Sequence, residues 1–591
     1  MNEMRLKNQK TDIAGRSLLI NILSIVLNIT ALTLIVAGFH HSTTDSALAL
    51  KISGILLLVI TIAAMLILKG LYLFSYVARA LVGGLFIVSG LIKANDPWGF
   101  AFKLQEYFSP SGLAYDYPFF EVFEPYTLQL SILICVVEIV LGAAVILGGK
   151  IKLASWALLV MMIFFTWLTY YTASCNESQQ LAMETGEEFS RDCVTDCGCF
   201  GDALRGSVGR SLTPLESFWK DLTLFYFVLI IFINQWKVKL NTSKENWIMI
   251  PAAMVVVGFF SWVFGWMFPI FFALIALLGS FVFSTVSIGK LSRSWKMAIY
   301  VVLLSFSFSI YTAMYLPVKD YRAYAIGNDL EEQMNNGVAP EIEMQLLYKN
   351  LKSGEVESFA VDEWETYMDT TKYKYVDRKD VVLKSGKDPS IMDFRPSIEF
   401  EKLSEKDKKT PYIDSIVTAD YEQYYVKMRT VESRYGTDTI WAVDYDSLIY
   451  PDSIYSVSAP YMAKTDPHAS WEINMTPYLL DVERVFLMTI RDMSAYNESS
   501  IDDFKKILEG AKEQGIPFYV LSPATDDQIR TFKSKHDFEA TFLTIDGTEI
   551  KIVIRSNPGL VLLENGVVRD KWPSRSIPDF DSIFEDYIKE K

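Results

Sequence analysis

The feature that most constrains this fold is a series of long apolar runs in the first half of the chain. A helix that crosses the hydrocarbon core of a bilayer needs about 20 predominantly apolar residues. We expect about nine spans: Ser17–Phe39, Leu50–Leu68, Tyr76–Ile92, Leu128–Leu147, Leu153–Tyr171, Phe218–Ile233, Trp247–Met267, Phe268–Ser287 and Met297–Leu316. Only Phe268-Pro269 separates the seventh from the eighth, so one re-entrant element across 247–287 is an alternative.

The distribution of basic residues predicts how these spans are oriented. Arg5, Lys7, Lys10 and Arg16 precede an apolar run that is too long for a signal peptide and lacks a small-residue cleavage pattern, so we expect a retained span. With nine spans, the short loops rich in Lys and Arg fall on the side of the N-terminus, which is the cytoplasmic side. The loop Cys175–Glu216 and everything after Pro317 then face the exterior. In a bacterium this means an inner-membrane protein with a periplasmic C-terminal domain.

The second half of the chain is polar and holds most of the acidic residues. The net charge of the chain is −15, which argues against a nucleic-acid partner and fits a solvated module. The predicted organisation is N-terminal transmembrane helices (1–73), a four-helix membrane bundle with a cysteine loop (74–237), further transmembrane helices (238–318), a partly β linking region (319–475) and an α/β domain (476–591). The fold of 414–475 is not assignable from the sequence.

Four of the five cysteines lie between Cys175 and Cys199, in a polar stretch between two apolar segments. Four external thiols allow three pairings, and two structural disulfides are the simplest interpretation. A redox-active pair is the alternative, because Cys197 and Cys199 are separated by one glycine and a bridge between them closes a small, easily reduced ring. Zinc is disfavoured, since Cys197-x-Cys199 is too tight for a typical ligand pair, and we predict no metal site. Cys135, inside a span, is expected to be a packed thiol.

Several polar residues in or beside the spans are candidates for a site within the membrane. Glu138 lies inside the fourth span, where a carboxylate is costly and marks either a functional group or an ion pair with another helix, with Arg79 or Lys220 as the expected partner. Lys93 and Asp96 lie at the outer edge of the third span, as interfacial anchors or as part of a polar site under the cysteine loop. The third span also holds small residues, Gly83, Gly84, Ser89 and Gly90, which predict close packing of this helix against its neighbours.

Two stretches of this region resemble known membrane families. The segment from Arg79 to Pro97, RALVGGLFIVSGLIKANDP, followed by Phe102–Phe108, resembles the core signature of the DoxX family of small four-helix membrane proteins. Cys197-Gly-Cys199-Phe-Gly-Asp202, ahead of Lys220-Asp221, is similar to the MauE branch, which is associated with methylamine dehydrogenase maturation. The resemblance covers Ser75–Trp236 and implies redox work at the membrane, either disulfide handling or quinone-linked oxidation.

The last part of the chain predicts a β-α-β-α-β-β-α order. The strands are Val485–Ile490, Phe518–Leu521, Thr541–Ile545, Leu560–Leu563 and Val567–Trp572, with Asn565-Gly566 as a hairpin turn. This order resembles the thioredoxin fold, with Pro558 at the place of that fold's cis-proline. The stretch that should hold the dithiol reads Met493-Ser-Ala-Tyr-Asn497, and the domain has no cysteine. The resemblance therefore implies a redox-inactive domain that binds a client beside Pro558, Ser494 and Asn497, or a platform without a ligand.

Three functions remain open at this point. The first is an accessory protein of envelope thiol–disulfide handling or protein maturation, in which Cys175, Cys193, Cys197 and Cys199 carry any exchange. Its partners are envelope proteins or a separate thioredoxin-like protein, within membrane lipid. The second is a non-enzymatic scaffold of an envelope complex. The third is a membrane subunit of a quinone-linked oxidoreductase, with quinone as the one cofactor considered, because no haem or flavin motif is present. The sequence does not identify the client, the electron donor, the pathway or the oligomeric state.

Overall fold

The computed structural model describes residues 71–185, 188–287, 290–339, 341–384, 386–403, 408, 415, 425–434, 436–447, 449–464 and 472–589. The predicted spans Ser17–Phe39 and Leu50–Leu68, with the basic N-terminus, lie outside these residues. The chain divides into two compact units, Met1–Tyr321 and Arg322–Lys591, which are considered separately below.

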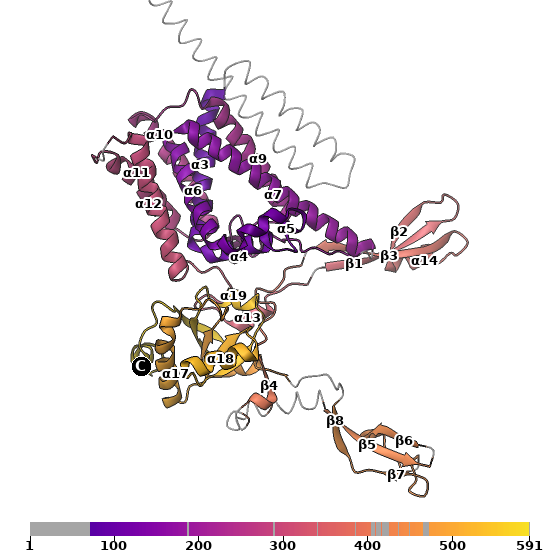
Figure 1. Ribbon diagram of the computed structural model, residues 1–591. Helices are drawn as coiled ribbons and strands as arrows, with labels where there is room; N and C mark the ends of the chain where they lie inside the picture. The colour runs from indigo at the N-terminus through magenta and orange to yellow at the C-terminus, as the bar shows by residue number, and fades with distance from the viewer. Residues whose placement is uncertain are drawn as a thin grey trace, which may run out of the picture. The chain divides into compact units, whose positions relative to one another are not determined.

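The first unit is built from helices (Figure 1). Its described elements are α3 (Leu71–Asn95), α4 (Pro97–Phe108), α5 (Leu113–Asp116), η1 (Pro118–Tyr126), α6 (Thr127–Leu147), α7 (Ile151–Thr185), α8 (Ala203–Val208), α9 (Pro214–Asn234), α10 (Ser243–Val263), α11 (Phe268–Ser284) and α12 (Arg293–Met314). Helix α3 packs against α6, α9 and α10, while α7 runs along α9.

Within the described residues, five helices are long and apolar enough to cross a membrane: Phe74–Asn95, Pro118–Leu147, Ile151–Ala182, Ser243–Val263 and Arg293–Met314. Helix α11 is apolar but shorter. Helix α9, which covers the predicted span Phe218–Ile233, carries Glu216, Lys220 and Asp221 and is not among the five. The total of nine spans stays a prediction. The region 247–287 forms two separate helices rather than one continuous element, with Gly265 in a left-handed turn between them.

Glycines set the close contact between α3 and α6. A Cβ atom built on Gly90 would lie 2.9 Å from the Cys135 carbonyl oxygen and 3.0 Å from the Glu138 Cβ. Any larger residue at position 90 would therefore push the two helices apart. This agrees with the prediction that the small residues of the third span serve helix packing, and it brings Lys93 and Glu138 within reach of each other.

Helix α7 is longer than predicted, and this changes the place of one cysteine. The predicted span ends at Tyr171, but the helix continues to Thr185. Residues 172–185 contain no Pro or Gly to break it, and they include good helix formers such as Ala, Gln, Leu and Met. Cys175 therefore lies on a helix and not in the loop.

The second unit centres on a seven-stranded sheet with strand order β14-β13-β10-β11-β12-β4-β9. The strands are β4 (Ser397–Glu399), β9 (Glu472–Asn474), β10 (Arg484–Thr489), β11 (Phe518–Ser522), β12 (Thr541–Thr544), β13 (Gly559–Glu564) and β14 (Val567–Pro573). Strands β10, β11 and β12 are parallel, and the other pairings are antiparallel. Helices α17 (Ile501–Glu513) and α18 (Asp526–His536) contribute Phe504 and Phe532 to its core.

The strand positions predicted for residues 485–572 agree with this sheet, while the likeness to the thioredoxin fold stays a prediction. A short helix, α19 (Glu549–Val553), was not predicted. It forms because the Asp546 carboxylate accepts the N–H groups of Thr548 and Glu549 at its start. The chain ends in α20 (Phe580–Ile583) and one π-helical turn, Phe584–Ile588.

The linking region is β-rich, as predicted, and two of its strands, β4 and β9, are among the seven strands of that sheet. Strands β1 (Glu341–Asn350), β2 (Val356–Ala360) and β3 (Tyr373–Lys384) form a three-stranded antiparallel sheet. A second sheet is formed by β5 (Tyr425–Ser433), β6 (Gly436–Trp441), β7 (Ser456–Val457) and β8 (Tyr461–Lys464). The region around these sheets also contains three short helices: α13 (Leu330–Asn335), α14 (Trp364–Tyr367) and α16 (Thr476–Asp481). Helix α13 begins after its cap, Asp329, whose carboxylate accepts the N–H groups of Glu331 and Glu332.

Candidate functional site

The four clustered cysteines form two disulfides, Cys175–Cys193 and Cys197–Cys199. The first joins helix α7 to the loop that follows it, with 5.7 Å between the two Cα atoms. Beside it, the Asn176 side chain donates to the Val194 carbonyl at 2.8 Å. Cys175 is buried, and Cys193 is half-buried. This bridge fixes the base of the loop that carries the second disulfide.

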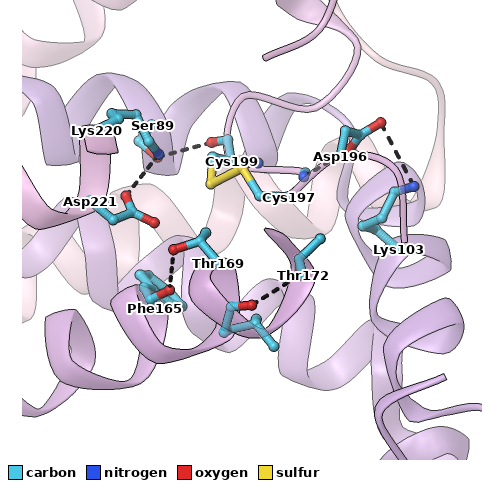
Figure 2. The surroundings of a disulfide bond; sticks show 12 residues. Ser89, Lys103, Phe165, Thr169, Thr172, Asp196, Cys197, Cys199, Lys220 and Asp221 are labelled. Atoms are coloured by element: carbon cyan, nitrogen blue, oxygen red, sulfur yellow. Dashed lines mark hydrogen bonds and ion pairs between the residues drawn. A yellow bond between two sulfur atoms is a disulfide. The ribbon is translucent and has the colours of Figure 1, made fainter. Parts of the chain in front are cut away.

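The Cys197–Cys199 loop is held by local hydrogen bonds. Gly198 has a φ of +61°, and its N–H donates to Asp196 Oδ1 at 2.9 Å. The Cys199 N–H donates to Cys197 Sγ at 3.3 Å. Ser89 of α3 donates to the Cys199 carbonyl at 3.2 Å, which ties the loop to the helix bundle (Figure 2).

The same disulfide borders a cavity of about 220 Å³ inside the helix bundle. Residues of α3, α4, α5, η1, α6, α7 and α9 line it, and most of them are Leu, Phe, Ile or Met. The other lining residues carry polar groups or sulfur: Ser89, Lys93, Tyr107, Glu138, Thr169, Lys220, Asp221, Cys197 and Cys199. In Figure 2, Ser89, Lys220 and Asp221 lie to one side of the disulfide and Thr169 lies below it. The disulfide also borders a second, shallow hollow, whose lining includes Asp196, Gly201, Leu204 and Leu212.

Lys93 and Glu138 form an ion pair in the cavity wall. Their Nζ and Oε1 atoms are 2.5 Å apart, and both side chains are almost fully buried. The Lys93 ammonium also lies over the rings of Phe100 and Phe165, at 5.1 Å and 5.5 Å from their centroids. Among the described residues, Oε2 of Glu138 has no hydrogen-bond partner.

The prediction that Glu138 pairs with Arg79 or Lys220 is wrong, because neither side chain reaches it. Lys220 pairs with Asp221, at 2.9 Å, and its ammonium lies 5.2 Å from the centre of the Phe200 ring. Asp221 is buried, and its Oδ2 accepts no hydrogen bond from the described part of the chain. Lys93, predicted at the outer edge of its span, supplies the partner instead.

Arg79 and Asp96 lie outside the lining of this cavity. Arg79 donates to the carbonyls of Val145 and Ile146 at the end of α6 and to Asn241 Oδ1, and thus caps that helix. Asp96 is the N-cap of α4 and accepts the Gly99 N–H at 2.9 Å. Both have structural roles.

Lys103 of α4 lies beside the disulfide loop and was not predicted. Its ammonium is 2.7 Å from Glu106 and 3.8 Å from Asp196. Burial alone would lower the pKa of Lys103, but attraction to Asp196 and Glu106 raises it above its ordinary value, so the cation persists at neutral pH. Ser89, Tyr107, Thr169 and Asp221 were also missed as site residues. Asp221 had a signal in the sequence, since it stands with Lys220 directly before the long apolar run of that helix.

In the second unit, the residues predicted to bind a client lie in the loop after β10 and directly before β13, which are neighbouring strands of the sheet. The Asn557–Pro558 bond is cis, and Pro558 itself is buried. The Asn497 N–H donates to the Asn557 carbonyl at 2.9 Å. Ser494 is exposed, and both its N–H and its hydroxyl donate to Asp492 Oδ1. Ser494 is therefore the residue of the three that a client would reach most readily.

The described residues contain no group of three or more His, Cys, Asp or Glu side chains arranged to hold a metal ion. A model of the family described as methylamine utilisation protein MauE matches residues 71–179. No curated protein and no solved structure matches this chain. The match covers α3 to most of α7, which includes Lys93, Glu138 and Cys175 and ends before the other three clustered cysteines. Together with the five apolar helices, it supports a multi-pass membrane protein.

Proposed function

We propose that this protein is an accessory membrane protein of thiol–disulfide handling in the bacterial envelope, and that Cys197–Cys199 is its exchanging pair. The observation that carries the proposal is the setting of this disulfide. It is half-buried, it borders both a shallow hollow and an internal cavity, and a backbone N–H donates to one of its sulfurs. The MauE match supports an accessory role of the methylamine-utilisation type.

The hydrogen bond from the Cys199 N–H to Cys197 Sγ assigns a role to each sulfur. When a client thiolate attacks Cys199 Sγ, the Cys197–Cys199 bond breaks and negative charge develops on Cys197 Sγ. The N–H is already in place to stabilise that charge. Cys199 is thus the sulfur that binds the client, and Cys197 is the leaving group.

The exchange is completed by the second thiol of the client. Its thiolate attacks the client sulfur of the mixed disulfide, the bond to Cys199 breaks, and the client leaves with a disulfide. Two electrons and two protons pass from the client to Cys197 and Cys199, which become thiols. A membrane-soluble acceptor of the quinone class then reoxidises the pair. Cys175–Cys193 keeps the loop in position.

We place the loop and the second unit on the exterior side of the inner membrane, as the basic loops predict. The cysteine-free domain would present clients through the surface around Ser494 and Asn497, beside Pro558. A scaffold without exchange chemistry is the competing proposal, and the lack of a dithiol in residues 476–591 favours it. The two proposals differ in whether the loop thiols are needed.

Three full-length variants test the exchange: Cys197→Ser, Cys199→Ser and the double variant Cys175→Ser/Cys193→Ser. Envelope proteins are trapped with acid, alkylated and separated without reductant. We expect Cys197→Ser to hold partners through Cys199, released by reductant, and Cys199→Ser to hold at least tenfold fewer. The double variant should retain exchange. If no variant forms a mixed disulfide and all three rescue a deletion, the scaffold is the better account.

A further inference from the structure

We infer that the cavity bordered by Cys197–Cys199 binds the ring of a lipid-soluble quinone, which reoxidises this pair. The inference rests on the proposed thiol exchange, because that exchange leaves Cys197 and Cys199 as thiols that need an electron acceptor. It adds the chemical class of that acceptor, the place where it binds and the residues that hold it.

The cavity reaches the apolar outer surface of the helix bundle. Phe123 of η1 and Phe164 of α7 both line it, and they are 38% and 37% exposed. Both belong to segments that are long and apolar enough to cross a membrane. A ligand dissolved in the bilayer can therefore approach the cavity at these two exposed rings, and an isoprenoid tail can remain in lipid while the quinone ring lies inside.

The polar groups of the cavity fit a quinone better than an acyl chain. An acyl chain needs only apolar contact, and burying charged groups beside it is costly. A quinone ring carries two carbonyl oxygens that accept hydrogen bonds, and Lys93 and Lys220 are donors in the wall. The quinol carries two hydroxyl donors, and two buried acceptors without partners among the described residues, Glu138 Oε2 and Asp221 Oδ2, suit them.

Oxidation of the two thiols and reduction of the quinone also involve equal numbers of electrons and protons. Closing the Cys197–Cys199 bond releases two electrons and two protons, and reducing one quinone to its quinol consumes the same number. Because Cys197 and Cys199 line the cavity themselves, electrons need no further carrier within the protein.

A pair of neighbouring tryptophan substitutions on α6 tests the site. Ile134 lines the cavity and is half-buried, whereas Leu133 is 57% exposed and does not line it. Ile134→Trp fills the cavity, and Leu133→Trp is its matched control. The full chain is placed in phospholipid nanodiscs with short-tailed ubiquinone or menaquinone. Bound quinone is extracted and quantified, and the Cys197–Cys199 redox state is followed by alkylation after reduction.

We expect the wild type and Leu133→Trp to retain quinone and to reclose the disulfide when quinone is added. Ile134→Trp should retain at least tenfold less quinone and reclose at least tenfold more slowly. Equal retention in both tryptophan variants, or phospholipid as the sole extracted ligand, would overturn the inference. The double variant Cys197→Ser/Cys199→Ser should still retain quinone, which separates the binding site from the exchange. Client oxidation that proceeds without any quinone dependence would leave the proposed function standing and refute this inference.

Discussion

Lys93 Nζ lies 2.5 Å from Glu138 Oε1, and the two side chains are 4% and 3% exposed. The pair joins α3 to α6 where Gly90 allows the helices to touch. Two opposite charges removed from water depend on each other, because either one alone would be buried without compensation. The rings of Phe100 and Phe165 complete the surroundings of the ammonium.

Glu138→Gln should therefore destabilise the full chain strongly. It leaves the Lys93 cation without its carboxylate, and we expect the free energy of unfolding to fall by about 3–5 kcal/mol. Thermal unfolding in detergent, compared with wild type, measures the loss. The double variant Lys93→Met/Glu138→Leu removes both charges and should recover most of it.

An exposed pair provides the control for this experiment. Arg210 and Glu216 form an ion pair with side chains 61% and 42% exposed. Arg210→Gln should lower stability by only about 0–1 kcal/mol, since solvent screens the interaction. A loss in Arg210→Gln as large as that in Glu138→Gln would show that burial is not what makes the Lys93–Glu138 pair important.

The stability of the second unit should depend on pH through His536. Burial is the main cause that lowers the pKa of His536 below its ordinary value, followed by repulsion from Lys535. Its Nε2 lies 2.7 Å from the Tyr496 hydroxyl. Because the folded state disfavours the charged imidazolium, the unfolded state binds more protons in the window below the unfolded pKa. Stability is thus fully present above about pH 6.5 and falls as the pH drops through that window.

Chemical unfolding of wild type and His536→Gln between pH 5 and pH 8 measures this effect as a difference. The wild type should lose more stability than the variant as the pH falls, because glutamine does not titrate. A pH profile that is parallel in the two proteins would contradict the assignment to His536.

The Cys175–Cys193 bridge should contribute to stability without taking part in exchange. It encloses a loop with a sequence separation of 18 residues. A loop of this size constrains the unfolded chain by about 3 kcal/mol. Cys175→Ser/Cys193→Ser should lower the melting temperature while leaving Cys197–Cys199 able to react with a thiol probe. A full loss of reactivity in a folded variant would instead place Cys175 and Cys193 in the exchange.

The sequence predicted an ion pair with another helix as one of two roles for Glu138, but it did not predict the partner, and side-chain direction explains why. Lys93 stands near the C-terminal end of α3 and reads as an anchor at the membrane edge. However, side chains in a helix point back toward its N-terminus, and a long lysine side chain at this end reaches into the bundle. The contact with Glu138 also needs the close approach at Gly90. The small residues of α3 predicted close helix packing but not that Gly90 would lie against Cys135 and Glu138 of α6.

The disulfide region, too, was only partly predictable from the sequence. The clustering of Cys175, Cys193, Cys197 and Cys199 was visible, while the pairing depended on α7 continuing past Tyr171. Strands β10 to β14 were predictable from short, largely apolar runs and from the turn Asn565-Gly566, because those signals are local. The cavity was not predictable, since its lining comes from elements spread between Leu85 and Leu224.

Gly198→Ala should weaken the Cys197–Cys199 loop more than the same change at Gly201. Both glycines have positive φ, +61° and +49°, so alanine costs about 1–2 kcal/mol of backbone strain at either position. A Cβ on Gly198 would in addition lie 2.9 Å from the Cγ of Lys103, whereas one on Gly201 meets nothing within 4 Å. Gly201→Ala therefore isolates the backbone cost, and the difference between the variants reports the contact with Lys103. Alkylation of free thiols in the folded protein should show more open Cys197–Cys199 in Gly198→Ala than in Gly201→Ala. Equal opening would mean that the Lys103 side chain moves aside freely and does not help to fix the loop.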